Sequence, residues 1–159
     1  MNIFILDEDP ILAARMMCDK HVVKMVLEST QILSTVAHSK GFKTYYKPTH
    51  RHHPCTLWAA RSIQNWAWLL DHSLALCDEY TLRYNRVHKC YRVLIQLKIL
   101  DIDLPDIGLT DFVLAMPDCY KSSSPVDSYR AYYLGSKRKF AKWKHSPTPQ
   151  WWKDNIENG

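Results

Sequence analysis

Residues 50–88, HRHHPCTLWAARSIQNWAWLLDHSLALCDEYTLRYNRVH, decide the fold of this chain. Pro54 suits the first turn of a helix, where its missing N–H costs little, and neither Pro nor Gly interrupts the sequence from there to Cys90. The stretch therefore predicts one long helix that begins at Pro54. The other helices of the chain would pack against it.

This predicted helix has an apolar side and a polar stripe when it is wound at about 100° per residue. The apolar side carries Trp58, Ile63, Trp66, Leu69, Leu70, Leu74, Cys77 and Tyr84. The opposite stripe carries Arg61, Asn65, Trp68, His72 and Glu79. A tryptophan among polar residues indicates either a binding surface or a stripe that another segment covers. We expect Trp68 to lie on the polar side, near Arg61 and His72, rather than deep in the core.

Helical periodicity also dominates the rest of the chain, and almost nothing alternates as a half-buried strand would. Asp9 and Pro10 form a good helix start, as capping residue and first-turn residue. We therefore predict an all-α fold in a single domain over residues 1–159. Its further helices are expected over residues 10–17, 19–37, 87–100 and 125–144, with a turn or two of helix within 110–116.

The remaining segments are expected to be irregular. Residues 1–6 would form a short strand or an extended arm tucked into the core, and residues 39–53 a loop broken by Gly41 and Pro48. The tail after His145 holds two close prolines, so it should be irregular, with its two tryptophans packed onto the body. The expected core includes Val22, Val26, Leu33, Trp66, Leu70 and Cys77.

Composition favours a soluble, cytoplasmic protein. The chain has 159 residues, 47% of them hydrophobic, but no apolar run approaches the roughly 18 residues that a membrane span needs. Its first ten residues, MNIFILDEDP, have the wrong order of charge and apolar residues for a signal peptide. Five scattered cysteines without a CxxC pair suit a reducing compartment.

Positive charge is concentrated in two segments that also carry aromatic residues. The net charge is +5, and the segments are KGFKTYYKPTHRHH (40–53) and SKRKFAKWKH (136–145). Lysine and arginine neutralise phosphates while aromatic rings stack on bases, so nucleic acid or a nucleotide is the expected partner, with Lys137 and Arg138 among the contacts. The alternative is a pair of solvated loops.

One polar helix face is the first candidate for chemistry. Lys20, Lys24 and Glu28 follow one another at i, i+4 and i+8, beside Asp19 and His21. Such a set could perform general acid–base chemistry or hold a phosphate. It could equally be an ordinary exposed face with a Lys24–Glu28 ion pair.

The histidine-rich loop is the second candidate. His50, His52, His53 and Cys55 are typical metal-ligand types, but the H-x-H-H-P-C spacing matches no zinc module. Loop histidines more often contact phosphate or cap helices, so His50 and His53 are expected as nucleic-acid contacts. We expect no metal and no cofactor.

The order of features resembles the pyrimidine-dimer DNA glycosylases of the phage endonuclease V type. The resemblance lies in LAARMMCDKHVVKM near the start, HHPCTLW in the middle and PTPQWW at the end, and it is diffuse over most of the chain. It implies an all-α protein that binds duplex DNA and flips a base. It also implies attack on the sugar C1′ by the N-terminal α-amine, assisted by a glutamate and nearby basic residues.

Carried over by position, the resemblance gives the amine to Met1 or Asn2 and the basic roles to Lys20 and Lys24. The place of the acid falls on His21, which leaves Asp19 or Glu28 as substitutes. Family members expose a small second residue after Met removal, whereas Asn2 is too large for efficient removal.

Three functions are compatible with these patterns. The first is an enzyme that breaks or remakes an N-glycosidic bond in DNA or a nucleotide. The second is a non-catalytic binder of nucleic acid or of a nucleotide signal, such as a small phage protein that sequesters one. The third is a structural protein with a protein partner. Turnover separates the first two, and salt-dependent affinity for nucleic acid or nucleotide separates both from the third.

Overall fold

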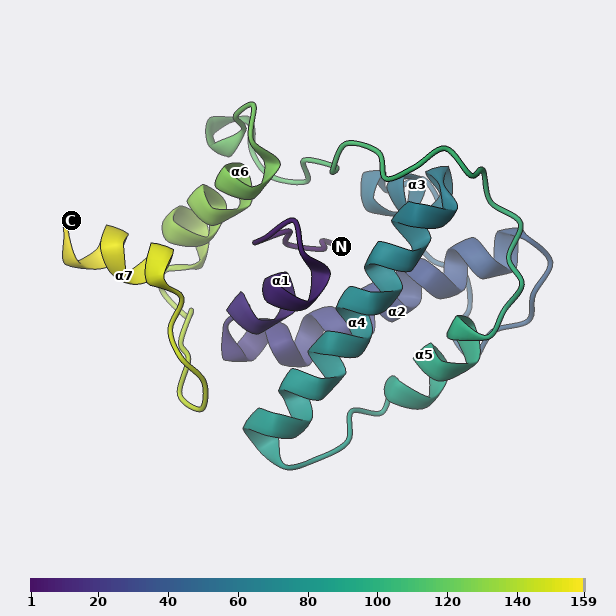
Figure 1. Ribbon diagram of the computed structural model, residues 1–159, viewed down its shortest axis with the longest axis horizontal. Coiled ribbons are helices and arrows are strands. Elements are labelled where there is room, and N and C mark those ends of the chain that lie inside the picture. Colours follow the sequence, from purple (N-terminus) through teal and green to yellow (C-terminus); the bar gives the residue numbers. More distant parts are fainter. Residues whose placement is uncertain (159) are drawn as a thin grey trace.

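Seven α-helices make up the fold across residues 1–158, the part of the chain that a computed structural model describes (Figure 1). No residue in that range lies in a strand, so the prediction of an all-α fold is confirmed. Nor is any of these helices long and apolar enough to cross a membrane. The helices are α1 (Pro10–Met16), α2 (Asp19–Ser39), α3 (Pro54–Arg61), α4 (Ile63–Tyr84), α5 (Tyr91–Lys98), α6 (Pro125–Tyr132) and α7 (Gln150–Glu157).

The single long helix expected from Pro54 is in fact two helices, α3 and α4, separated at Ser62. The backbone of Ser62 is extended (φ −150°, ψ 158°), and its side-chain oxygen caps α4 by accepting a hydrogen bond from the N–H of Asn65 at 3.0 Å. The N–H of Ile63 donates to the carbonyl of Pro105 at 2.9 Å. α4 ends at Tyr84, and the capping residue that follows, Asn85, has a left-handed backbone (φ 52°).

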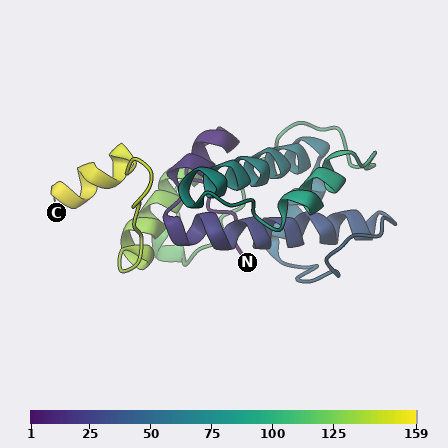
Figure 2. The same cartoon turned by 90° about the horizontal axis from the view of Figure 1, so that it is seen from below.

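The core lies where α4 crosses α1 and α2, the two helices with which it makes most of its contacts. In Figure 2, α4 and α2 form two layers, one above the other. Leu33, Leu69 and Leu76 are completely buried. The predicted core is confirmed, because all six of its residues are buried: Val22, Val26, Leu33, Trp66, Leu70 and Cys77.

The polar stripe of α4 is covered by other segments, so the expected position of Trp68 was wrong. The side chain of Trp68 is only 6% exposed, and its Nε1 donates to the carbonyl of Glu8 at 2.8 Å. His72 is fully buried and donates from Nδ1 to the carbonyl of Pro10 at 2.9 Å. Asn65 is also fully buried, and its amide donates to the carbonyl of Trp58 at 2.8 Å.

The C-terminal third differs most from the predicted helices. Residues 101–117 contain no helix, and after α6 the chain makes one π-helical turn, Tyr133–Lys137, instead of continuing as α-helix to residue 144. The tail is not irregular throughout, because Pro149 sits at the start of α7 and its missing N–H does not interrupt that helix. Trp152 packs onto Trp143 with ring centroids 5.0 Å apart, as expected for the tail tryptophans.

A buried ion-pair network joins α2 to α4. The guanidinium of Arg83 contacts the carboxylates of Glu79 at 3.0 Å and of Asp19 at 3.2 Å. It also donates to the carbonyls of Met17 at 2.7 Å and Arg15 at 3.0 Å. The side chain of Arg83 is completely buried and both carboxylates are nearly so. Each of these charges is therefore stabilised by its opposite charge and not by water.

Removal of the Arg83 charge should destabilise the fold strongly. We expect Arg83→Met to lower the free energy of unfolding by about 3–5 kcal/mol, because two buried carboxylates lose their counter-ion. Urea unfolding followed by circular dichroism measures the loss. The exposed neighbour Arg86 provides the control, since Arg86→Met should change stability by no more than about 0.5 kcal/mol. Equal stability of the two variants would contradict the role of the network.

Candidate functional site

The start of the chain, residues 1–6, is an extended arm buried in the protein. Of the two predictions for this segment, a short strand or an arm tucked into the core, the second is confirmed. Ile3, Ile5 and Leu6 are fully buried. The side chain of Asn2 shapes the arm: its Oδ1 accepts hydrogen bonds from the N–H groups of Ile3 (2.8 Å) and Phe4 (3.1 Å), and its Nδ2 donates to the carbonyl of Ala115 (2.6 Å). These bonds hold the beginning of the chain in one place.

Phe4 has a left-handed backbone (φ 54°), which is rare for a bulky residue and persists only where the surroundings enforce it. Its ring stacks on His21 at 4.3 Å and lies over Tyr132 at 5.8 Å, with Tyr133 edge-on at 5.5 Å. The contacts of the ring and the bonds of Asn2 together enforce the turn. This bend lies two residues after Asn2, whose backbone nitrogen faces α2.

Glu28 meets the chain start. Its Oε2 accepts a hydrogen bond from the backbone nitrogen of Asn2 at 3.2 Å, across 26 residues of sequence. Glu28 is half-buried on α2, and Figure 2 shows the start of the chain beside α2 on the side away from α4. Of the two carboxylates considered from the sequence, Asp19 and Glu28, Glu28 is therefore the one that contacts the arm.

His53 lies near the same point. Its Nδ1 accepts a hydrogen bond from the N–H of Cys55 at 3.1 Å and so caps α3. The neutral ring therefore carries its proton on Nε2. Burial lowers the pKa of His53, the ammonium group at the chain start and His50 lower it further, and Glu28 opposes them. His50 is exposed, with its ring 6.4 Å from that of His53.

His21 does not occupy the position of an acid. Its ring is buried, and its Nδ1 forms a 2.5 Å hydrogen bond with the hydroxyl of Tyr133. Burial lowers the pKa of His21 to about 3, with further contributions from the positive charges of Lys137 and Lys24. The ring is therefore neutral near pH 7 and packs against Phe4 and Tyr133, whereas the predicted role of an acid requires its protonated form.

Asp19 is likewise occupied by structural contacts. One carboxylate oxygen pairs with Arg83, and the other accepts a hydrogen bond from the backbone N–H of Lys144 at 2.8 Å. The backbone N–H of Asp19 donates to the carbonyl of Lys142 at 2.9 Å. Asp19 therefore anchors the basic C-terminal segment to α2, and its bonds leave it poorly placed for proton transfer.

A group of lysines, the lysine surface, surrounds the exposed face of α2. Lys20 and Lys24 are exposed on that face, and the Nζ of Lys20 lies 5.2 Å from the ring centre of Phe140. The Nζ of Lys137 lies 4.6 Å from the ring centre of Tyr132. A hollow of about 440 Å³ beside Lys20 is also lined by three further lysines. We define the lysine surface as Lys20, Lys24, Lys137, Lys139, Lys142 and Lys144.

The other predicted contacts are distributed differently. Arg138 is exposed next to Lys137 and adjoins the lysine surface. Arg61 is exposed at the end of α3, whereas Asn65, Trp68 and His72 are buried and cannot reach a ligand at the surface. The predicted set is thus divided into a group around α2, a buried group on α4, and Arg61 at the end of α3.

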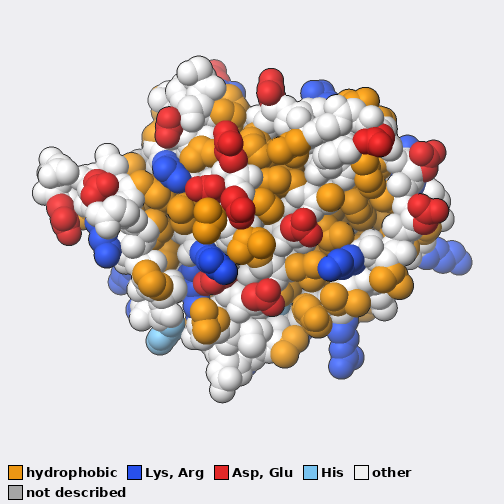
Figure 3. Space-filling model, in the orientation of Figure 1, with side chains coloured by type: hydrophobic (Ala, Val, Ile, Leu, Met, Phe, Trp, Pro, Cys, Tyr) orange, Lys and Arg blue, Asp and Glu red, His pale blue; other side chains and the backbone are white. Residues whose placement is uncertain are grey.

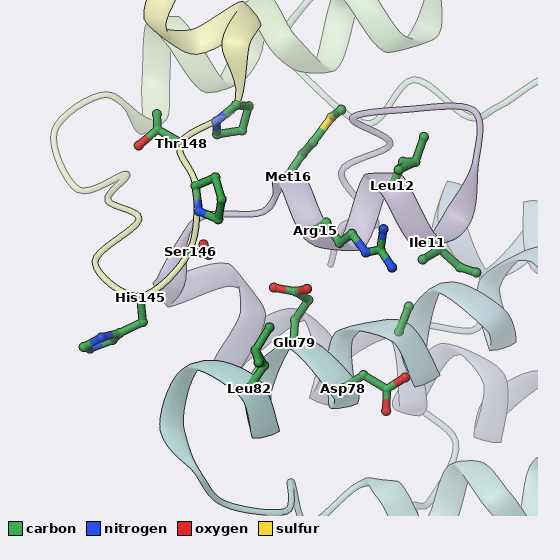
Figure 4. Close-up of a pocket in the computed structure, with 13 residues that line it drawn as sticks. Ile11, Leu12, Arg15, Met16, Asp78, Glu79, Leu82, His145, Ser146 and Thr148 are labelled. Atoms are coloured by element: carbon green, nitrogen blue, oxygen red, sulfur yellow. The ribbon is translucent and has the colours of Figure 1, made fainter.

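A larger hollow, of about 650 Å³, lies between α1, α4 and residues 145–149 (Figure 4). Its wall combines apolar side chains such as Leu12 and Met16 with Arg15, Asp78 and Glu79, and no lysine lines it. Figure 3 shows acidic side chains scattered over the face that bears α1 and α4. This mixture suits a polyanion less well than the lysine surface does.

The resemblance placed the amine of Met1 or Asn2 in the site, but the sequence did not reveal that Phe4, with its left-handed backbone and its stack on His21, shapes the arm there. The sequence pattern that could have indicated the contact between Glu28 and the arm is the position of Glu28, one helical turn beyond Lys24, together with an apolar N-terminal segment that can pack across that helix. Among residues 1–158, no three His, Cys, Asp or Glu side chains come together as possible metal ligands.

Buried neutral histidines predict acid-sensitive stability. Burial lowers the pKa of His72 to about 4 and that of His21 to about 3, whereas a histidine in the unfolded chain has a pKa of about 6.5. The unfolded chain therefore binds more protons below about pH 6.5, and each histidine should cost up to about 1.4 kcal/mol of stability per pH unit as pH falls towards its folded pKa.

Urea unfolding between pH 7 and pH 4.5 measures this slope. We expect His72→Leu to flatten it relative to the unmodified protein, although the variant is less stable at pH 7 because the bond to Pro10 is lost. Substitution of the exposed His38 with Leu should leave the slope unchanged. An identical slope for all three proteins would show that His72 is not held neutral.

Residues 1–92 match the family model described as pyrimidine dimer DNA glycosylase, and this match covers more than half of the 159 residues. The matched stretch contains the arm, Glu28, His53 and all of α1 to α4. Neither the search of the curated proteins nor that of the solved structures found a match.

Proposed function

Because this chain belongs to the pyrimidine dimer DNA glycosylase family, we propose that it releases a base from DNA with the α-amine at the chain start as nucleophile and Glu28 as the acid–base group. The observation that carries the proposal is the 3.2 Å contact between the backbone nitrogen of Asn2 and Oε2 of Glu28. This contact brings a carboxylate to the start of the chain, where the family-level activity requires it.

The proposed reaction replaces one bond to the sugar C1′ by another. The lone pair of the unprotonated amine attacks C1′, and the electrons of the N-glycosidic bond leave with the base, which takes up a proton. Loss of the remaining amine proton and opening of the sugar ring give an imine between the protein and DNA. Glu28 is placed to accept a proton from the amine and to return one to the sugar or the leaving base.

Two residues can carry the reactive amine. In the chain that begins at Met1, the amine belongs to Met1, and the Asn2 nitrogen that contacts Glu28 is an amide. If Met1 is removed, the amine of Asn2 itself stands against Glu28. The mass of the intact purified protein distinguishes these forms.

The lysine surface supports DNA as the substrate. Exposed Lys20, Lys24 and Lys139 offer charge to backbone phosphates, since such contacts release counter-ions. His53, with its Nε2 proton directed away from its capping bond, is proposed as a contact to the sugar or phosphate next to the target base. Arg138, next to Lys137, is proposed as a further contact, as is His50, whose ring lies 6.4 Å from that of His53. The five free thiols suit the cytoplasm, which we propose as the location of the protein.

Borohydride should trap the proposed imine on ultraviolet-damaged duplex DNA. We expect Glu28→Gln to reduce the amount of covalent adduct by a factor of about 10² or more, because proton transfer is lost while side-chain shape is kept. Acetylation of the chain start should abolish the adduct. Denaturing electrophoresis of labelled DNA measures both effects.

The exposed Glu8 provides a matched control, because Glu8→Gln removes the same charge near the arm. This variant should form as much adduct as the unmodified protein. Full adduct with Glu28→Gln would reject the role of Glu28. No adduct and no base release on damaged, modified or undamaged DNA would reject the glycosylase and favour a non-catalytic binder.

Binding of duplex DNA should weaken as salt rises. Each phosphate contact contributes a slope of about −0.9 to the dependence of log K on log salt. Joint replacement of Lys20, Lys24 and Lys139 by Ala should therefore flatten the slope by about 2–3, as fluorescence anisotropy measures. Lys153→Ala, on α7, should leave the slope unchanged. An unaltered slope in the triple variant would show that duplex DNA does not bind at the lysine surface.

A further inference from the structure

A second basic and aromatic hollow lies on the protein, formed by segments more than 40 residues apart in sequence. We call it the tyrosine hollow: it has a volume of about 540 Å³ and is lined by Tyr45, Tyr46, Val87, His88, Lys89, Arg92, Val93 and Gln96. We propose that it binds an unpaired stretch of a DNA strand, with a base on the ring of Tyr45 and phosphates on Lys89 and Arg92. The site goes beyond the glycosylase proposal and does not depend on it.

Tyr45 is presented to a ligand rather than packed. Its side chain is 76% exposed, although a large aromatic residue normally buries most of its surface. Its ring stands edge-on to that of Tyr46, with centroids 5.1 Å apart at 90°. Tyr46 is half-buried, and its hydroxyl contacts the sulfur of Cys90 at 3.4 Å. Tyr46 therefore holds Tyr45 in place, and the ring face of Tyr45 stays accessible to a ligand.

The charge of the tyrosine hollow favours an anion. Lys89 and Arg92 are both exposed in its wall, and Gln96 lies one helical turn beyond Arg92 on α5. No Asp or Glu is among the eight residues that line it. Two cations beside a free aromatic face match the repeating phosphate and base of a single strand.

His88 fixes the tyrosine hollow against α2. Its Nδ1 accepts a hydrogen bond from the N–H of Cys90, and its Nε2 donates to the carbonyl of Val23, each at 3.1 Å. Figures 1 and 2 both show α5 and the α2–α3 connection at the same end of the molecule. The tyrosine hollow therefore has a fixed place beside the helix that carries Lys20, Lys24 and Glu28.

An unpaired strand is a better occupant than a duplex. Bases in a duplex are stacked on one another, so their faces cannot reach a side chain, whereas an unpaired strand offers a face at every base. The basic segment 40–53 contributes Tyr45 and Tyr46, and α5 contributes Arg92. The proposed site therefore gives a role to the tyrosines of this basic segment, which take no part in the reaction proposed at the chain start.

Binding of fluorescein-labelled dT12 to the full chain, measured by anisotropy, tests the proposal. We expect Tyr45→Ala to weaken binding by about ten-fold, and Tyr45→Phe to keep the affinity because it keeps the ring face. Arg92→Ala should weaken binding by several-fold and lower the salt slope by about 0.7. Lys98→Ala removes the same charge from α5 outside the hollow and should have no effect.

Three results would overturn the proposal. Tyr45→Ala could bind dT12 as tightly as the unmodified protein, or Tyr45→Phe could bind as weakly as Tyr45→Ala. Thymidine monophosphate could compete as strongly as unlabelled dT12, which would make this a site for a free nucleotide and not for a strand. Base release from damaged duplex, measured on the same variants, reports separately on the reaction at Glu28.

Discussion

The buried N-terminal arm is the constraint on which the site depends. Ile3, Ile5 and Leu6 lose all their contact with water, so the first residues of the chain are part of the core and not a loose end. Asn2 then satisfies its polar groups by bonding to the arm itself and to Ala115. A terminus held in this way has little freedom left to lose when it meets a substrate, which is how positioning lowers a reaction barrier. Glu8 and Pro10, which follow the arm, accept hydrogen bonds from Trp68 and His72 on α4.

The ion-pair network around Arg83 links the stability of the fold to the surface proposed for DNA. Asp19 uses one oxygen for Arg83 and the other for the backbone of Lys144, so the basic C-terminal segment is attached to the first turn of α2. Lys20 and Lys24 project from that same helix. The buried contacts of Asp19 therefore bring together the two parts of the chain that form the lysine surface.

Patterns local to one segment were predictable from the sequence. The cap at Asp9 and the helical repeats of residues 19–37 gave the all-α class and the core, because they depend on neighbours within a few residues. The break at Ser62 was missed, since a serine cap needs neither Pro nor Gly to end a helix. The burial of Trp68 was missed because its cover comes from Glu8, sixty positions away. The resemblance, carried over by position, gave the acid's place to His21 and left Asp19 or Glu28 as substitutes, because the contact between Glu28 and Asn2 spans 26 residues of sequence.

In the proposed reaction the chain start, and not a lysine, becomes bonded to the sugar. Peptide mapping by mass spectrometry of the borohydride-reduced complex with damaged duplex DNA distinguishes these two nucleophiles. We expect the sugar remnant on the N-terminal peptide, attached to the α-nitrogen of Met1 or, after its removal, of Asn2. A remnant on Lys20 or Lys24, with an unmodified N-terminal peptide, would contradict the proposed reaction.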